Sequence, residues 1–303
     1  MSSFNNARYV IATLESLRQQ TYPNVEIVVV DDCSTDDSVA VIERWLAACP
    51  IPSRFIKHKQ NTGVCRVAND LITNANGKYI SIIASDDLML SDKISLQVPI
   101  LEAAPAEVGI LYGDISRMDS DGAPLESSPF AEIGFLPPSG DVFLPLLRYN
   151  FMPAMSALIR KSCFEAVGLH DENLAFEDWD IWLRMALKFH FLYAPHTTAK
   201  YRVHGGSMTH QRRRQMSESC CMLLQKQLGV SPAGDAIIRD HLIRHAESLY
   251  FLESPRSAYW LLRRWQYQKD VRGLLLLVFA HLRVPAPWAS GLMGFMRKIK
   301  SVI

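Results

Sequence analysis

The sequence predicts an α/β protein, with a doubly wound, mostly parallel sheet followed by a helical region. Strand-type and helix-type stretches alternate through the first two thirds of the chain, which is the pattern of a parallel sheet covered by helices. Two aspartate pairs, Asp31-Asp32 and Asp86-Asp87, come directly after strand-type runs. They are expected at the carboxyl ends of the strands, where sheets of this kind bind their ligands.

The first elements are a helix, a buried strand and a second helix. Residues 7–20 have helical periodicity, with an apolar face made of Val10, Ile11, Leu14 and Leu17. Residues 25–30 are a β-branched run of the kind that is buried on both faces of a parallel sheet. Ser34 or Thr35 is expected to cap the next helix, which carries Val39, Ile42 and Trp45.

The rhythm continues with a short strand at residues 54–58, a helix opened by Asn61-Thr62-Gly63 and strands at residues 79–84 and 108–112. After about residue 205 the pattern becomes helical, at residues 216–228, 236–252 and 258–268 and in the apolar tail from Leu274. The sequence therefore predicts two domains, 1–205 and 206–303, with a boundary near Gly205-Gly206.

Composition narrows the class of protein. The 303 residues carry a formal net charge of +1, which gives no electrostatic case for nucleic-acid binding. No secretory signal is visible, and the longest apolar block, Leu274–Leu282, is too short for a membrane span of about 20 residues. The six cysteines lack a C-x-x-C pair, which favours reduced thiols in a cytosol. A soluble or membrane-peripheral protein is expected.

Six motifs occur in a characteristic order and spacing: FNNARYV (4–10), QQTYPNVEIVVVDDCSTDDS (19–38), NTGVCRVAND (61–70), GKYISIIASDDL (77–88), FEDWDIWLRM (176–185) and YRVHGGS (201–207). Together they resemble family 2 of the inverting glycosyltransferases, which have the GT-A fold, over about residues 4–207. The resemblance implies transfer of a sugar from a nucleotide-sugar donor, with UDP-sugars expected, to a glycan or a lipid-linked acceptor. It also implies a role in bacterial surface polysaccharide synthesis, of O-antigen or capsule type.

The resemblance implies a site for Mg²⁺ or Mn²⁺ on the second aspartate pair, because hard cations prefer carboxylate oxygens. Asp86 matches the metal-binding carboxylate of the family, Asp87 supports it and contacts the donor, and His204 completes the metal shell. Ala84 stands where the family often has a further aspartate, so the identity of the donor is open. The alternative for Asp86-Asp87 is a solvated turn that caps a helix.

The resemblance also implies a donor-binding cluster around the first aspartate pair. Asp32 would accept a hydrogen bond from the uracil or ribose, which gives selectivity because a wrong nucleotide leaves a buried group unpaired. The other donor-binding residues are expected to be Asp31, Asn61, Gly63, Arg66 and Arg202. The first pair can instead merely cap a helix. Arg202 can instead form a salt bridge, and Arg66 does not stand where many relatives have an arginine, since that place is Ala68.

Asp178 matches the catalytic base of the family, and Glu177 would assist acceptor binding or tune that base. Inversion is a single in-line displacement, so the acceptor hydroxyl needs a base to take its proton. The pair opens a predicted helix with Trp179, Leu183 and Ala186 on its apolar face, and Asp180, Trp182 and Arg184 are expected to brace the site. The alternative for the pair is an ordinary acidic helix start.

One departure from the family concerns the start of the chain, MSSFNNA. In the resembling proteins a central strand precedes the first helix, and here that strand is missing. Its absence would leave backbone groups unpaired and uncover apolar side chains. We expect that Met1 corresponds to an internal methionine at the end of that strand, and that the product or its ancestor starts upstream.

The helical tail and the remaining function classes stay open. Residues 274–303 mix apolar residues, Trp288 and basic charge, as in segments that dock on the inner face of the cytoplasmic membrane. Packing against the catalytic domain or a second subunit explains them equally well. A catalytically inactive nucleotide-sugar-binding relative is the main alternative function. A nucleotidyltransferase is disfavoured, because no glycine-rich basic loop lies near the N-terminus.

Overall fold

The computed structural model describes residues 1–125, 129–132, 134–205, 212–289 and 291. The chain divides into two units, Met1–Gly205 and Gly206–Ile303. The strands, all in the first unit, are β1 (Ser2–Ser3), β2 (Ile27–Asp31), β3 (Ser53–Lys57), β4 (Tyr79–Ile80), β5 (Leu88–Met89), β6 (Val108–Met118), β7 (Leu158–Arg160) and β8 (His190–Arg202).

The first unit also contains α1 (Val10–Arg18), α2 (Ser38–Ala47), α3 (Val64–Asn74), α4 (Lys93–Ala103), α5 (Pro129–Glu132), α6 (Phe143–Arg148), the 3₁₀ turn η1 (Ala154–Ser156), α7 (Lys161–Val167) and α8 (Asp178–Ala186). The alternation predicted from the sequence is therefore present. Residue numbers 206–211, which include the Gly206 of the expected boundary, lie outside the described residues, as does Phe295.

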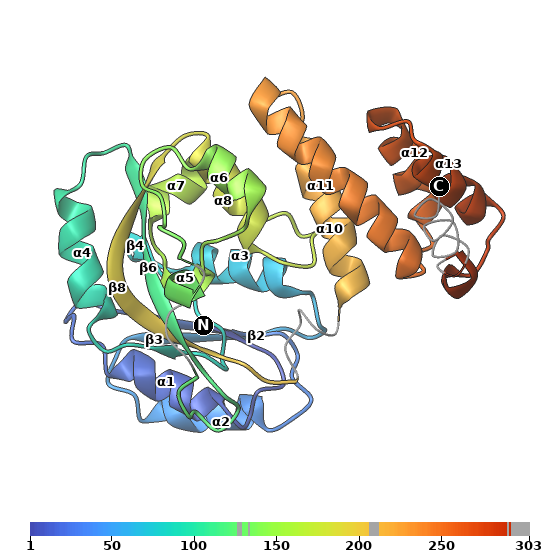
Figure 1. Ribbon diagram of the computed structural model, residues 1–303. Helices are drawn as coiled ribbons and strands as arrows, with labels where there is room; N and C mark the ends of the chain where they lie inside the picture. Colours follow the sequence, from blue (N-terminus) through green and yellow to red (C-terminus); the bar gives the residue numbers. More distant parts are fainter. Residues whose placement is uncertain (126–128, 133, 206–211, 290, 292–303) are drawn as a thin grey trace. The chain divides into compact units, whose positions relative to one another are not determined.

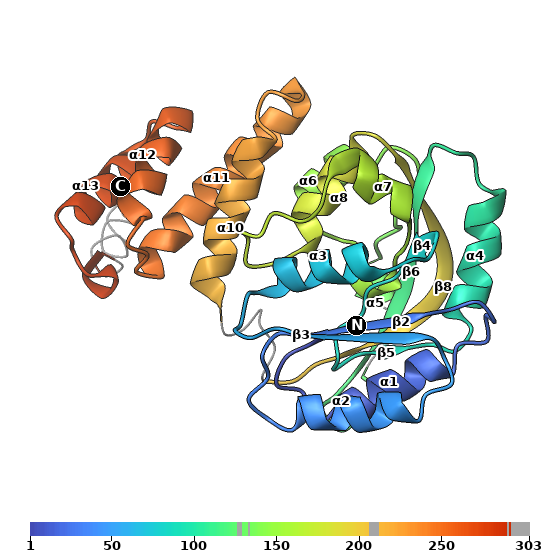
Figure 2. The ribbon, with the colours of Figure 1, turned by 180° about the vertical axis from the view of Figure 1, so that it is seen from behind.

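The first sheet is parallel and has the order β1-β2-β3. All five residues of β2 are buried, as expected for a β-branched central strand. Helices α1 and α2 lie on one side of this sheet and α3 on the other (Figures 1 and 2). The strand expected to be missing before the first helix is present: it is the two-residue strand β1, whose Ser2 stands opposite Val30.

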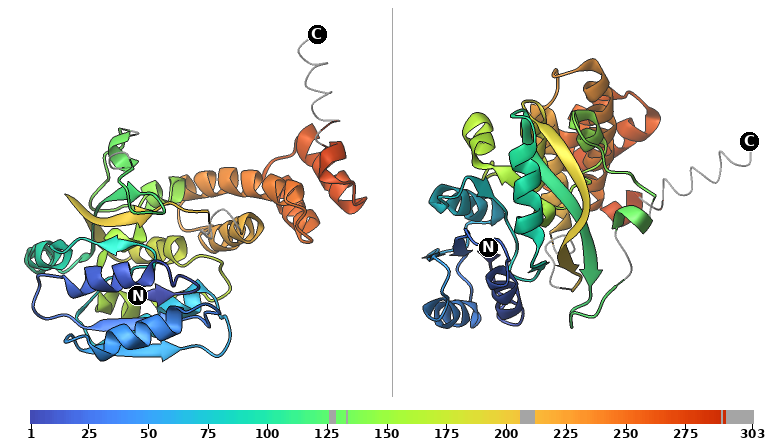
Figure 3. Two further views of the ribbon diagram at one scale, coloured as in Figure 1. Left: turned by 90° about the horizontal axis from the view of Figure 1, so that it is seen from below. Right: turned by 90° about the vertical axis from the view of Figure 1, so that its left-hand side faces the viewer.

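The second sheet is mixed rather than parallel and has the order β4-β7-β6-β8-β5. Only β6 and β8 run parallel within it, and they lie side by side along most of their length (Figure 3). An isolated parallel bridge from Ser2 to Ala84 joins the two sheets. Of the predicted strand 79–84, only Tyr79 and Ile80 form a regular strand. The following residues lie beside β1, which has only two residues to pair with them.

Two details of the first helices differ from the sequence prediction. Ile11 is 44% exposed, while Thr13 is completely buried beside Leu14, so the inward face of α1 is rotated toward Thr13. Neither Ser34 nor Thr35 caps α2, whose N-cap is Asp37. Ser34 bonds instead to Asp31, three residues before it, and Thr35 bonds to Asn5, 30 residues before it.

The second unit is helical, with α10 (Arg213–Lys226), α11 (Pro232–Phe251), α12 (Ser257–Tyr267) and α13 (Val271–His281). Each helix packs on the next. At its centre the fully buried Arg264 forms ion pairs with Glu247 and Asp270, both at 2.9 Å. A buried guanidinium needs such partners to offset its desolvation.

The described helices include none that is both long and apolar enough to cross a lipid bilayer. All six cysteines are free thiols, in agreement with the expectation of reduced cysteines. They are Cys33, Cys49, Cys65, Cys163, Cys220 and Cys221.

Candidate active site

The turn that carries Asp86 and Asp87 is fixed by the buried hydroxyl of Thr13. Thr13 Oγ1 on α1 lies 2.9 Å from the carbonyl of Ser85 and 2.8 Å from that of Asp87. Asp87 is only 2% exposed, whereas the Asp86 side chain is 21% exposed. The two neighbouring carboxylates therefore have different environments, and Asp86 is the one that can reach a ligand.

The end of β8 brings two further sequence-predicted residues to this turn. The backbone N–H of Arg202 donates to Asp87 Oδ1 at 2.8 Å, and its Nε donates to the carbonyl of Asp86 at 2.8 Å. His204 Nε2 lies 3.0 Å from Asp86 Oδ2. This hydrogen bond from Arg202 lets Asp87 hold the end of β8 in place. Burial, and then the charge of Asp86, raise the pKa of Asp87 well above its usual range.

Asp86 and His204 offer one carboxylate oxygen and one imidazole nitrogen to a cation. Both are atom types that divalent ions accept. The part of the chain that the structure describes contains no group of three or more His, Cys, Asp or Glu side chains that could hold a metal. Two protein ligands still fit Mg²⁺ or Mn²⁺, because such ions commonly take their other ligands from substrate phosphates and water.

Tyr9 is a member of this cluster that sequence reasoning missed. The guanidinium carbon of Arg202 lies 4.6 Å from the centroid of the Tyr9 ring, in a cation–π contact. The His204 ring centroid is 5.2 Å from the same ring. Tyr9 thus packs against both basic residues at the site, and no local pattern in the sequence announces this contact.

Every carboxylate oxygen of the first aspartate pair accepts at least one hydrogen bond from the protein. The fully buried Asp31 accepts hydrogen bonds from the backbone N–H and hydroxyl of Ser34, at 2.8 and 2.7 Å, and from the hydroxyl of Ser3 at 2.9 Å. Asp32 accepts from the backbone N–H groups of Thr62 and Gly63, at 2.7 and 2.9 Å. Both carboxylates therefore shape loops at the strand end.

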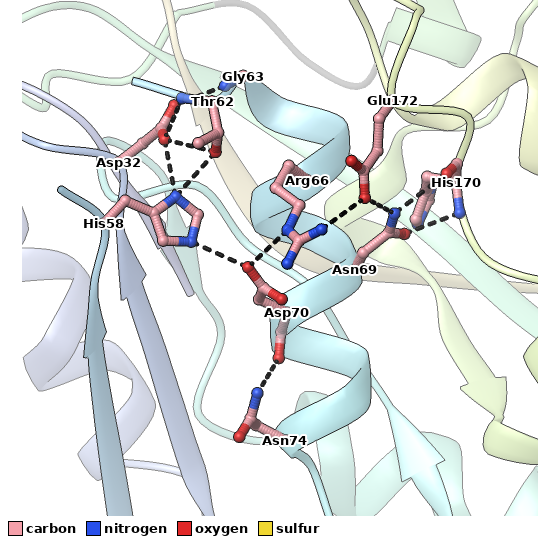
Figure 4. A network of polar contacts seen from close by, with 10 residues as sticks. All are labelled: Asp32, His58, Thr62, Gly63, Arg66, Asn69, Asp70, Asn74, His170 and Glu172. Atoms are coloured by element: carbon pink, nitrogen blue, oxygen red, sulfur yellow. Dashed lines mark hydrogen bonds and ion pairs between the residues drawn. The ribbon is translucent and has the colours of Figure 1, made fainter. Parts of the chain in front are cut away.

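His58 continues the contacts of Asp32 (Figure 4). Its Nδ1 lies 2.9 Å from Asp32 Oδ1 and its Nε2 lies 2.9 Å from Asp70 Oδ2. Burial alone would raise the pKa of Asp32, but the hydrogen bonds from Thr62, His58 and Gly63 outweigh it and hold that pKa below its usual range. Asp32 is consequently ionised at neutral pH.

The network of Figure 4 runs on through α3. Arg66 lies 3.2 Å from Asp70 and 3.4 Å from Glu172, so its guanidinium is engaged by two carboxylates. Asn69 exchanges hydrogen bonds with the backbone of His170, at 2.8 and 3.1 Å. These hydrogen bonds attach the segment before α8 to α3, the helix that begins after Thr62 and Gly63.

Segment Ser2–Asn6 connects the two aspartate pairs. Ser3 bonds to Asp31, and the side-chain amide of Asn6 donates to Ser85 Oγ at 3.0 Å. Asn61 Nδ2 donates to the carbonyl of Asp32 at 3.3 Å. The structure therefore brings both pairs to neighbouring strand ends, as the pattern of the sequence predicts.

The third acidic pair lies at the start of α8, with Glu177 as N-cap and Asp178 as first helical residue. The helix is held by Trp179, whose indole Nε1 donates to the carbonyl of Leu146 at 2.7 Å. Asn150 Nδ2, which sequence reasoning missed, donates to Asp178 Oδ2 at 2.8 Å. The remaining expected bracing residues are buried (Asp180, Trp182) or bound to neighbouring carbonyls (Arg184).

Both carboxylates of this pair have raised pKa values. Burial, and then the charge of Asp178, raise the pKa of Glu177 to about 7. Burial likewise raises the pKa of Asp178, although the hydrogen bond from Asn150 opposes it. A carboxylate with a pKa near neutrality accepts protons far better than an ordinary one. The pair can therefore act as a general base.

Comparisons with known proteins agree with this architecture. The model of glycosyl transferase family 2 matches residues 1–168, and a second model, glycosyltransferase like family 2, matches residues 126–222. An uncharacterized glycosyltransferase of Rickettsia felis is 31% identical over 183 residues, which cover 60% of this chain and 30% of the relative. The succinoglycan biosynthesis protein ExoO of Rhizobium meliloti is 32% identical over 182 residues, 59% of this chain and 50% of ExoO. The matched part thus spans a third to a half of these relatives.

Two solved structures share the fold. Staphylococcus aureus TarS (residues 1–349) in complex with UDP superposes with a TM-score of 0.65 at 16% identity, covering 93% of this chain and 85% of the other. The mannosyltransferase PcManGT of Pyrobaculum calidifontis in complex with GDP-Man and Mn²⁺ gives a TM-score of 0.62 at 18% identity, covering 95% and 81%.

Proposed function

The chain belongs to glycosyl transferase family 2, and on this premise we propose that it is a metal-dependent, inverting glycosyltransferase. It moves a sugar from a nucleoside-diphosphate donor, with UDP-sugars expected, to a hydroxyl of a glycan or lipid-linked oligosaccharide. The observation that carries the proposal is the pair Glu177-Asp178, whose raised pKa values suit a base, in the same unit as the contact between Asp86 and His204.

The donor phosphates are expected at the second aspartate pair. Asp86 and His204 would hold Mg²⁺ or Mn²⁺, which when bound neutralises the charge of the departing nucleoside diphosphate. Asp87 and Tyr9 keep the end of β8 and Arg202 in place for this contact. A neighbour in fold binds GDP-Man and Mn²⁺, which supports a donor–metal site of this kind.

The nucleoside is expected at the first pair, with Asp31, Asp32, Asn61 and Gly63 forming the wall of its pocket. The Asp32 carboxylate accepts the N–H groups of Thr62 and Gly63, and its Oδ2, which holds one of these bonds, has a second lone pair for a donor group of the base. Arg66 would have to leave its acidic partners to reach a phosphate. Complexes of TarS with UDP and with UDP-GlcNAc support a uridine donor.

Asp178 is the proposed base for the acceptor hydroxyl. Its Oδ1 accepts the backbone N–H of Trp179 and its Oδ2 the amide of Asn150, so the carboxylate is fixed in one orientation. Burial raises the pKa of Asp178, and burial together with the charge of Asp178 raises the pKa of Glu177. Removal of the hydroxyl proton as the new bond forms contributes about 10²–10⁴ in rate.

A role in cell-surface polysaccharide synthesis at the inner face of the cytoplasmic membrane follows from the same premise, with a relative named for succinoglycan biosynthesis in support. One face of α13 could contact that membrane. Val271, Leu274, Val278 and Leu282 on it are 42–71% exposed, and Trp288 beyond it is 77% exposed. Apolar residues with nearby basic charge suit an interfacial position.

The test is a panel of nucleotide sugars measured with and without Mn²⁺. Thermal shift identifies the donor that binds, and release of nucleoside diphosphate then measures turnover. The proposal expects a metal-dependent shift with one class of donor, followed by release. Binding without release would instead support the inactive relative, and release of pyrophosphate from a nucleoside triphosphate would support a nucleotidyltransferase.

A further inference from the structure

The two oxygens of the Asp32 carboxylate have different surroundings. Oδ1 is within hydrogen-bond distance of the backbone N–H of Thr62 at 2.7 Å, the Thr62 hydroxyl at 2.9 Å and the imidazole Nδ1 of His58 at 2.9 Å. Among the described residues, Oδ2 receives a hydrogen bond from the backbone N–H of Gly63 alone, at 2.9 Å. Each carboxylate oxygen has about two lone pairs. Oδ1 is therefore fully used by the protein, and Oδ2 keeps one lone pair for a ligand.

His58 is held at its backbone and at both ring nitrogens (Figure 4). It directly follows β3, and its backbone N–H donates to the carbonyl of Asp31 at 2.9 Å. Its side chain is only 10% exposed. Nδ1 faces Asp32, and Nε2 lies 2.9 Å from Asp70 Oδ2. Because the imidazole is a rigid ring with a carboxylate at each nitrogen, its rotation would break both contacts together.

Asp70 is in turn fixed on α3. Its Oδ2 lies 3.2 Å from Nε of Arg66, one helical turn before it, which is a spacing at which opposite charges stabilise a helix. The backbone carbonyl of Asp70 accepts the side-chain amide of Asn74 at 2.9 Å. Asp32 is thus connected through His58 to a regular helix, as well as to the loop that follows His58.

That loop supplies the other hydrogen bonds to Asp32, and all four of its residues, 59–62, are exposed. Surface loops move more than the elements that they connect. An ionised carboxylate that is only 4% exposed, as Asp32 is, needs donors that stay in place, because an unpaired buried charge is costly. Among its side-chain partners, His58 is the one that is itself nearly buried and anchored on a second element.

We propose that His58 is a positioning residue for donor binding, which holds Asp32 with Oδ2 turned toward the nucleoside and thereby sets how strongly the site discriminates between nucleotides. The inference rests on the proposed function, in which Asp32 contacts the uracil or ribose. The group that Oδ2 receives is an N–H or O–H donor, because an ionised carboxylate can only accept. A buried contact of this kind discriminates well when its geometry is fixed by supporting side chains.

Two substitutions separate the contacts of the ring. In His58→Asn the side-chain amide nitrogen takes roughly the place of Nδ1 and can still reach Asp32, whereas in His58→Gln it takes roughly the place of Nε2 and can reach only Asp70. His196→Gln, at an exposed histidine of the same unit, is the matched control. The ligands are UDP and three analogues that each lack one donor group: N3-methyl-UDP, 2′-deoxy-UDP and 3′-deoxy-UDP.

Calorimetric titration in the presence of Mn²⁺ gives the affinity for each ligand. The unchanged chain should prefer UDP by about tenfold or more over the analogue that lacks the group bound by Oδ2. In His58→Gln the affinity for UDP should fall by about tenfold and this preference should shrink to within about threefold. His58→Asn and His196→Gln should keep the preference. A residue with a merely structural role would weaken UDP and all three analogues equally, so an unchanged preference in His58→Gln would overturn the proposal.

Amide exchange without ligand tests the positioning by itself. The N–H groups of Thr62 and Gly63, which both donate to Asp32, should exchange several-fold faster in His58→Gln than in His58→Asn. If the unchanged chain binds no nucleotide, the proposed function fails, while this difference in exchange still supports the hold of His58 on Asp32 and equal exchange rates overturn it. Should His58→Gln not fold, Asp70→Asn replaces it in both measurements, with a smaller effect in the same direction, and no effect in either measurement would overturn the proposal.

Discussion

Asp86 and His204 are 118 residues apart in the chain, yet Asp86 Oδ2 and His204 Nε2 lie 3.0 Å apart. The contact depends on Asp87, which fixes the backbone of Arg202 two residues before His204. The pair therefore exists only because β8 ends beside the turn after β4. The same arrangement makes the proposed metal site testable one atom at a time.

Replacing Asp86 with Asn should reduce Mn²⁺-dependent release of nucleoside diphosphate by about 100-fold or more, because a neutral amide is a weak ligand for a hard cation. His204→Ala should weaken the metal affinity by a smaller factor, about tenfold. Titration of activity with Mn²⁺ measures both. Asp121→Asn, at an exposed carboxylate that pairs with Arg8, is the matched control, and equal losses in all three variants would contradict the assignment.

Asp178→Asn should lower turnover by about 10²–10⁴ while donor binding, followed by thermal shift, stays near that of the unchanged chain. The amide has nearly the shape of the carboxylate and can still contact Asn150. Asn150→Ala should cost less, since it removes only one hydrogen bond from the base. A turnover in Asp178→Asn within threefold of the unchanged chain would remove Asp178 from the proposed mechanism.

The pH dependence of turnover should show an acidic limb near pH 7. The proposed base, Asp178, must be ionised to accept the proton of the acceptor hydroxyl. Its neighbour Glu177 has a raised pKa of about 7, so the Glu177-Asp178 pair takes up a proton as the pH falls through that value. Turnover should then drop about tenfold per unit on the limb. In Glu177→Gln the limb should move to lower pH, because Asp178 no longer has a like charge beside it. A limb that stays at the same pH in this variant would separate Glu177 from the catalytic titration.

The exposed face of α13 should bind anionic vesicles if it docks on a membrane. Leu274→Asp with Val278→Asp should abolish flotation of the full chain with such vesicles, since both side chains are more than 40% exposed and a charge opposes insertion. Leu136→Asp, at a residue 84% exposed in the first unit, serves as control. Unchanged flotation in the double variant would show that the exposed face of α13 does not bind the membrane.

The features that could be predicted from the sequence are those encoded by local pattern. The β-branched run at residues 25–30 predicts β2, which the structure places at Ile27–Asp31, and the acidic start of α8 places Glu177 and Asp178 correctly at its N-terminus. Both signals are strong because burial and helix polarity act within a few neighbouring residues.

The features that could not be predicted depend on partners far along the chain. Asn150 reaches Asp178 across 28 residues and Thr13 holds the turn of Asp87 across 74. Thr35 looks like a helix cap in isolation, but its hydroxyl donates to Asn5 Oδ1 across 30 residues. Contacts of this kind are set by the packing of whole elements, and they leave no periodicity in the sequence.

Helix α3 contacts both the loop around Asp32 and the segment that precedes α8. The helix begins directly after Gly63, whose backbone N–H donates to Asp32. One turn later Asn69 accepts the backbone N–H of His170. The imidazole Nδ1 of His170 in turn lies 2.9 Å from the carbonyl of Glu177. One short helix therefore links the loop around Asp32 to the start of α8. In the proposed mechanism, a tilt of α3 would displace the donor site and the base together.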